Sequence, residues 1–99
     1  MGLNFKFSNF FKKQFKNYIK KDKQLISKKL KQVKINPFRF PKLAGYKFIF
    51  KINITIENNY SRLIYVVFYP DKEYITILGI FERKHSYKDF KKLYKQILR

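Results

Sequence analysis

The sequence predicts an α+β domain, in which an antiparallel sheet of about four strands packs against an N-terminal helical hairpin and carries a C-terminal helix. Residues 46–56 alternate apolar and polar side chains with a period of two, a pattern that only a strand sorts onto two faces. Residues 10–19 and 25–33 instead repeat apolar side chains at helical spacing. The connections between the later strands are short, which indicates that these strands form mainly a meander.

The strand expected at residues 46–56 has an apolar face made of every second residue: Tyr46, Phe48, Phe50, Ile52, Ile54 and Ile56. The opposite face is polar apart from Ile49: Lys47, Lys51, Asn53 and Thr55. Residues 62–69 are apolar at both parities after Arg62, which predicts a central strand covered on both faces. A turn is expected at Pro70–Lys72, and residues 74–81 are expected to form the next strand.

The N-terminal part of the chain predicts a short strand followed by two helices. Residues 3–7 alternate like a strand, and Ser8 or Asn9 is a candidate N-cap for the first helix. Asp22 is the corresponding candidate for the second helix, which Asn36–Pro37 would end. The apolar stripes of the two helices are Phe10, Phe11, Phe15, Tyr18 and Ile19, and then Leu25, Ile26, Leu30 and Val33.

A linker at residues 36–45 and a final helix at residues 86–98 complete the expected domain. Two prolines keep the linker extended, and Gly45 permits an unusual backbone angle where the chain enters the sheet. Ser86 is a candidate cap for the final helix, whose stripe would be Phe90, Leu93, Tyr94 and Ile97. No repeat or domain boundary interrupts the sequence, so residues 1–99 are expected to form a single domain.

The net charge of +18 predicts an acidic partner, because such a field attracts polyanions independently of their sequence. Fifteen Lys or Arg residues fall in residues 1–56 against the lone acid Asp22. The alternative is compositional: an A/T-rich genome favours Lys, Ile, Phe, Asn and Tyr codons together, and a lysine-rich helix face is often merely solvated. A membrane-surface helix is a further, weaker alternative, because the aromatic stripe is needed to cover the sheet.

Other classes of site are not expected. The sequence has no cysteine, one histidine and six scattered acids, so we expect no disulfide, no bound metal and no cofactor. No stretch approaches the ~20 apolar residues of a membrane span, and the N-terminus lacks a continuous apolar signal region, so a cytoplasmic protein without membrane contact is expected.

A succession of motifs resembles the RelE/ParE superfamily of bacterial and archaeal toxins. These are the linker NPFRFPKLAG, a strand with Lys51, the strand YSRLIYVV and the closing ERKHSY. The resemblance covers residues 3 to 97 in order and spacing. It implies the toxin of a type II toxin–antitoxin system, with a small acidic antitoxin as partner.

The superfamily has two branches, and the retained residues favour one of them. RelE-like members cleave messenger RNA in the ribosomal A site without a metal, whereas ParE-like members poison DNA gyrase. Lys51 matches the strand lysine of the RelE branch, Arg62 its strand arginine, Arg83 the arginine after the last strand and Tyr87 the closing tyrosine. The resemblance therefore implies a metal-independent mRNA endoribonuclease. A gyrase inhibitor and a non-catalytic nucleic-acid-binding domain remain as alternatives.

The sequence also departs from the family pattern at four positions. Ala44 stands where many members have a basic residue, and Asn53 where some have a second lysine. Ser61 separates Tyr60 from Arg62, which are usually adjacent, and His85 replaces an acid or another polar residue. These departures leave open which residue acts as the base.

Metal-free RNA cleavage requires removal of the 2′-hydroxyl proton, stabilisation of charge on phosphorus and protonation of the leaving oxygen. Arg62 and Arg83 suit the charge, because a guanidinium fork matches two phosphate oxygens. Lys51 could stabilise charge or act as base, and His85 and Tyr87 are the other candidates for proton transfer. Each of these residues could instead have a purely structural or solvated role. Further RNA contacts are expected from Lys42, Lys47, Asn53 and Lys84.

Overall fold

The computed structural model describes residues 4–43, 45–68, 74–82, 90–92 and 95 of the 99-residue chain. Four strands and two helices lie within these residues: β1 (Asn4–Phe7), α1 (Asn9–Asn17), α2 (Lys20–Ile35), β2 (Ile49–Ile56), β3 (Asn59–Val67) and β4 (Tyr74–Glu82). The α+β class predicted from the sequence is confirmed. None of the described helices is long and apolar enough to cross a membrane.

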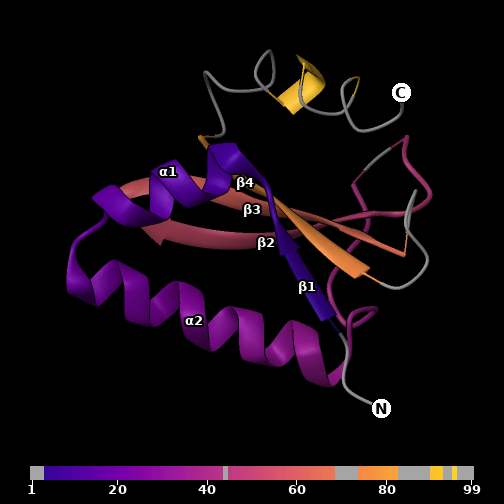
Figure 1. The fold of residues 1–99 in the computed structure, drawn as a ribbon, viewed down its shortest axis with the longest axis horizontal. Coiled ribbons are helices and arrows are strands. Elements are labelled where there is room, and N and C mark those ends of the chain that lie inside the picture. The colour runs from indigo at the N-terminus through magenta and orange to yellow at the C-terminus, as the bar shows by residue number, and fades with distance from the viewer. Residues whose placement is uncertain (1–3, 44, 69–73, 83–89, 93–94, 96–99) are drawn as a thin grey trace.

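The strands form one sheet in the order β1-β4-β3-β2, as Figure 1 shows. The predicted meander is confirmed for β2, β3 and β4, which pair antiparallel. The sheet as a whole is mixed, because β1 lies parallel to β4, with Asn4 opposite Tyr74 and Phe7 opposite Ile77. The first strand therefore pairs with the last one, and the helical hairpin and two further strands separate them in the sequence.

The central strand β3 is buried on both faces, as its apolar run predicts. On one face Leu63, Tyr65 and Val67 belong to a helix-side core, to which α2 contributes Ile26 and Val33. On the other face, which we call the outer face, the apolar core has these members: Leu43, Ile49, Ile64, Val66, Leu78, Phe81 and Phe90. In Figure 1 α2 and the C-terminal helical turn accordingly lie on opposite sides of the sheet.

The start of β2 differs from the prediction. Residues Phe50, Ile52, Ile54 and Ile56 enter the helix-side core as expected. The strand begins at Ile49, however, and not at Tyr46, because the chain turns at Gly45 with a φ of +87° and bends before the strand. Tyr46 consequently packs on the outer face, where its ring meets Phe90 edge-on at 5.7 Å. Phe48 is 46% exposed, and Ile49 is buried in the core of the outer face.

Helix α1 closes the free edge of β4 beyond the end of β1. Ser8 is the N-cap, as predicted: its Oγ accepts a hydrogen bond from the amide of Phe11 at 3.0 Å and donates one to the carbonyl of Leu78 at 2.6 Å. The side-chain amide of Gln14 then pairs with both backbone groups of Ile80, at 2.6 and 2.8 Å. The helix thus satisfies backbone groups that a sheet edge would leave open.

A bulge in β4 sets the orientation of its last residues. Ile64 pairs with Gly79 and Tyr65 with Ile77, so Leu78 is an extra residue on β4. Gly79 has a φ of +155°, and a Cβ there would come within 2.7 Å of the Phe10 ring, so only glycine fits. After the bulge, the side chain of Phe81 lies on the outer face, where its ring stacks on that of Phe10 with their centroids 5.4 Å apart.

The helix assignments need two corrections. Asp22 is not the cap of α2, because the helix begins at Lys20 and its N-cap is Ile19, which makes no capping hydrogen bond with its side chain. Asp22 lies in the first turn, where a negative charge is favourable beside the helix N-terminus. Ile19 is 59% exposed and so lies outside the apolar stripe of α1. Leu25 and Leu30 are only partly buried against the helix-side core.

The linker between α2 and β2 is fastened to the sheet at two places. The hydroxyl of Tyr65 donates a buried hydrogen bond of 2.8 Å to the carbonyl of Pro37. Further along, the carbonyl of Pro41 accepts from the amide of Lys51 at 3.0 Å, and the amide of Leu43 donates to Ile49 at 2.8 Å. The linker therefore runs along the edge of β2 that is opposite to β3. The expected turn at Pro70–Lys72 lies outside the described residues, as does most of the expected final helix. Of that helix, Phe90 is described: it is buried and lies in a helical turn.

Candidate nucleic-acid interface

An open hollow of about 430 Å³ lies on the outer face of the sheet, between β2 and β3. Seven residues of these two strands line it: Lys51, Asn53, Ile54, Thr55, Tyr60, Ser61 and Arg62. Two of them are cations, and among the seven there is no acid. The hollow therefore has the charge and the exposed polar groups expected of an anion site.

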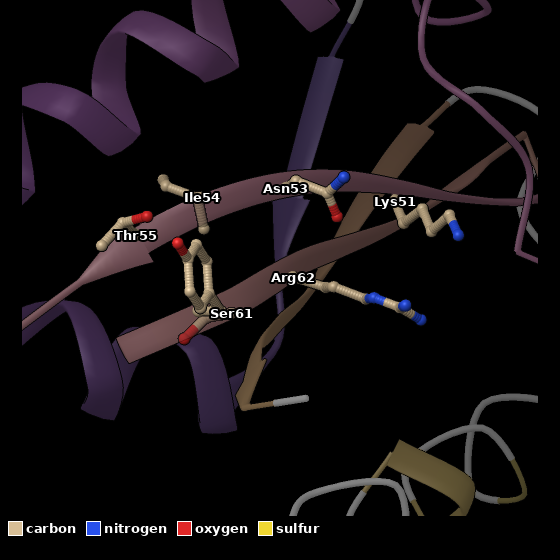
Figure 2. A pocket seen from close by; sticks show the side chains of 7 residues that line it. Lys51, Asn53, Ile54, Thr55, Ser61 and Arg62 are labelled. Atoms are coloured by element: carbon tan, nitrogen blue, oxygen red, sulfur yellow. The ribbon is translucent and has the colours of Figure 1, made fainter. Parts of the chain in front are cut away.

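The register of the hairpin brings these side chains together. Asn53 lies directly opposite Arg62, and Thr55 lies opposite Tyr60. Lys51 pairs with Ile64, so Lys51 and Arg62 are diagonal neighbours on the same face. The backbones of such diagonal residues are typically ~7–8 Å apart. Figure 2 shows their side chains extending in the same direction from neighbouring strands. The predicted outward orientation of Lys51 and Asn53 is thus confirmed.

The two-residue turn that joins β2 and β3 determines this register. Glu57 and Asn58 have φ angles of 53° and 65°, the left-handed pair that characterises a type I′ hairpin. A turn of this kind matches the twist of the strands and fixes Ile56 opposite Asn59. Counting back from that pair places Arg62 opposite Asn53.

Lys51 and Arg62 are both partly buried, whereas Asn53 and Thr55 are exposed. A partly buried cation is held by its surroundings and loses less side-chain entropy when it binds an anion. An arginine fork and a lysine ammonium on diagonal positions of one face can contact different oxygens of one phosphate or of neighbouring phosphates.

The other predicted RNA-binding residues on described positions do not line the hollow. Lys42 forms a bridge with Phe50 at the edge of the sheet, and residues opposite each other share a face. Lys42 therefore lies on the side of Phe50, away from Lys51. Lys47 is exposed in the bend before β2. Arg83, Lys84, His85 and Tyr87 lie outside the described residues, and their roles stay predictions.

Four residues of the hollow were not predicted as functional. Ile54 belongs to the helix-side core and Ser61 lies opposite it, whereas Thr55 and Tyr60 lie on the outer face. Parity places Thr55 on the polar face of β2, so its position could have been inferred from Lys51 and Asn53. The signal for Tyr60 is its separation of two residues from Arg62, since residues i and i+2 of a strand share a face. Tyr60 is 80% exposed.

A smaller hollow of about 200 Å³ lies at the end of the sheet near α1 and has the opposite character. Its lining includes Tyr18, Glu57 and Glu82. Burial, followed by the negative charges of Glu57, Asp22 and Glu82, raises the pKa of Tyr18 to about 12. The Tyr18 phenol therefore stays protonated at neutral pH, and the carboxylates would repel a phosphate. Among the described residues, no group of three His, Cys, Asp or Glu could hold a metal ion.

The comparison with known proteins rests on structure, because no protein-family model and no curated protein matches the sequence. Several solved structures are similar, among them three of E. coli proteins. A free RelE toxin with two arginines replaced by alanine has a TM-score of 0.71 at 20% identity, over 99% of this chain and 96% of that one. The chain has the RelE fold.

The other two structures agree with this result. The intact RelBE toxin–antitoxin complex gives a TM-score of 0.68 at 20% identity, covering 84% of this chain and 99% of the RelBE chain. Isolated RelE gives 0.67 at 20% identity, covering 95% and 98% of the two chains. Within this RelE fold, the hollow with Lys51 and Arg62 lies on the outer face, where Phe81 separates Arg62 from the C-terminal turn at Phe90.

Proposed function

We propose that this protein is the toxin of a type II toxin–antitoxin system and that it cleaves messenger RNA on the ribosome without a metal. The observation that carries the proposal is that Lys51 and Arg62 lie beside Asn53 in one hollow on the outer face, in a chain with the RelE fold. The net charge of +18 supports a polyanionic substrate.

In this proposal Arg62 binds the scissile phosphate and stabilises the charge that develops on it. The 2′-oxygen loses its proton and attacks phosphorus, and the bond from phosphorus to the 5′-oxygen breaks. Lys51, as the neighbouring cation, either helps to stabilise the negative charge on the phosphate or, with a neutral amine, accepts the 2′-hydroxyl proton. Asn53 can donate a hydrogen bond from its amide to a phosphate or ribose oxygen.

Arg83, His85 and Tyr87 complete the proposed set through the resemblance of the sequence. Arg83 follows directly after Glu82, which lies opposite Ser61 and hence one residue from Arg62 along β3. We assign Arg83 to the phosphate, and His85 or Tyr87 to protonation of the leaving 5′-oxygen. Lys42, Lys47 and Lys84 are proposed to bind the RNA backbone away from the scissile phosphate.

The proposed activity is tested by adding the purified protein to ribosomes that carry a defined messenger RNA, in magnesium-containing ribosome buffer. We expect cleavage of the messenger in the A site and none of the same RNA in the absence of ribosomes. Induction in cells, with mapping of messenger 5′ ends and of gyrase-linked DNA breaks, separates the alternatives. Breaks in DNA without messenger cleavage would support gyrase inhibition, and binding without either would support a non-catalytic RNA-binding domain.

The proposed partner is a small acidic antitoxin, and we place both proteins in the cytoplasm, where messenger RNA is translated. The support is the likeness to the toxin in the RelBE toxin–antitoxin complex and the basic surface of this chain. Such a partner would complement the charge and cover the outer face. We expect the product of an adjacent gene to co-purify with the tagged toxin and to suppress cleavage. A toxin that is expressed alone without harm and retains no protein would contradict this assignment.

A further inference from the structure

Tyr60 is an exposed aromatic side chain that lines a hollow containing two cations. It is the second residue of β3 and lies opposite Thr55, and 80% of its surface is exposed to solvent. It lines the same hollow as Lys51 and Arg62. A large aromatic ring gains little for the fold in this position, because burial is what makes aromatic residues stabilising.

The position of Tyr60 follows from Ser61. Successive residues of a strand point to opposite faces, so a residue directly before Arg62 faces the helix side and a residue two before faces the outer side. Ser61 takes the first of these places: it is 5% exposed and lies opposite Ile54 of the helix-side core. A tyrosine directly before Arg62 would face the helix side. Because Ser61 lies between them, Tyr60 is on the same face as Arg62, since a shift of one residue changes the face of a side chain.

A purely structural role explains little of this arrangement. Tyr60 and Thr55 form a cross-strand pair of an aromatic and a β-branched residue, which adds some stability to a hairpin. A ring that is 80% exposed, however, has most of its surface in water. Thr55 itself is exposed, so the pair shields no core.

We propose that Tyr60 is a stacking platform for a base of the RNA whose phosphate is bound at Arg62 and Lys51. Two residues along a strand span ~6.6 Å, which is comparable to the distance between the phosphate and the base of one nucleotide. Exposed aromatic rings next to cations bind unstacked bases in this way, largely irrespective of sequence. The inference rests on the proposed function for the identity of the ligand, but it concerns binding and not cleavage.

The test uses the fact that the chain contains no tryptophan. The variant Tyr60→Trp has a single indole, whose fluorescence a stacked base should quench. The probe is a short single-stranded RNA with 2′-O-methyl groups, which prevents cleavage, and the comparison probe is the same backbone with abasic residues. We expect quenching by the first probe and little by the second. The matched control is Phe38→Trp, because Phe38 is also exposed, at 60%, but lies in the linker.

Affinity for the same RNA is the second measurement. Tyr60→Ala should weaken binding by roughly 5- to 100-fold, the usual range for loss of one stacked base, and Tyr60→Phe should stay within about twofold of the wild type. Circular dichroism of each variant shows whether the sheet is kept. Equal affinity of Tyr60→Ala and the wild type, or equal quenching by both probes, would overturn the inference.

These outcomes are separable from those of the proposed function. If ribosomal messenger RNA is cleaved and Tyr60→Ala binds and cleaves like the wild type, the toxin assignment stands and the stacking platform falls. If Tyr60→Trp is quenched and Tyr60→Ala loses affinity while no ribosome-dependent cleavage occurs, the platform stands and the nuclease assignment falls.

Discussion

Replacing Arg62 by alanine is expected to lower the single-turnover rate of messenger cleavage on the ribosome by on the order of 100-fold or more. Arg62 is the only arginine among the residues that line the hollow, and it lies opposite Asn53 and diagonal to Lys51. In the proposed mechanism, its loss removes a charge-assisted pair of hydrogen bonds at the point where negative charge increases during the reaction. The fold should persist, because the side chain of Arg62 is not part of either apolar core.

The conservative variant and two distant lysines separate the role of the fork from that of charge. Arg62→Lys should restore only part of the rate, because an ammonium keeps the charge but cannot make the paired contacts. Lys12→Ala and Lys20→Ala lie on exposed helical positions and should change RNA affinity and its salt dependence slightly, with no change in the rate of bound substrate. Arg83→Ala should behave like Arg62→Ala. Wild-type rates in both arginine variants would remove the basis of the nuclease proposal.

The helix-side core was predictable from the sequence because its signal is local. The alternation of Phe50, Ile52, Ile54 and Ile56 is visible within one strand, and each of these residues is buried. The core of the outer face was predictable only for β3, whose apolar run indicates burial on both faces, because the other members come from distant parts of the chain. Ile49 is the one apolar residue on a polar face of the strand, and it is buried in one core with Leu43 of the linker and Phe90 of the C-terminal turn.

The sequence also does not predict which strand β1 pairs with. An isolated segment of four alternating residues carries no information about its neighbour. The parallel pairing with β4 follows from the path of the chain through α1, which returns to the same edge and makes hydrogen bonds through Ser8 and Gln14. The sequence predicts the start of β2 too early for a similar reason, since the alternation extends through Tyr46 and Phe48 whether or not the backbone is paired.

The sequence predicts which face of its own strand a site residue occupies, because side chains alternate along a strand. It does not predict which residues of two strands lie side by side, because that depends on the register of their pairing. The outward orientation of Lys51 and Asn53 follows from their neighbours in the sequence. The position of Arg62 beside them depends on the type I′ turn, whose register cannot be counted until the turn length is known. Lys42 lies on the other face because of a bridge with Phe50 at the sheet edge, which no local pattern indicates.

Truncation of Phe50 to alanine is expected to lower the free energy of unfolding by ~3–5 kcal/mol, the usual cost of removing a buried phenylalanine ring. Phe50 is 3% exposed, and its ring stacks on Tyr65 with a centroid distance of 5.5 Å. Phe38 meets it edge-on at 5.8 Å. The cavity would therefore open beside Tyr65, whose hydroxyl holds the linker at Pro37. Urea denaturation measures the loss, and a midpoint temperature lower by roughly 4–8 °C per kcal/mol should accompany it.

Two variants in the same segment make this prediction specific to the register of β2. Phe48→Ala removes the same ring two residues earlier, but Phe48 is 46% exposed, so its loss should cost clearly less, about 1 kcal/mol. Lys51→Ala changes the next residue, which faces the hollow, and should leave stability within about 0.5 kcal/mol while slowing cleavage. Adjacent residues would thus affect either folding or reaction, as opposite faces of one strand require. Equal losses of stability for Phe50→Ala and Phe48→Ala would mean that β2 does not have this register, and Lys51 would then not face Arg62.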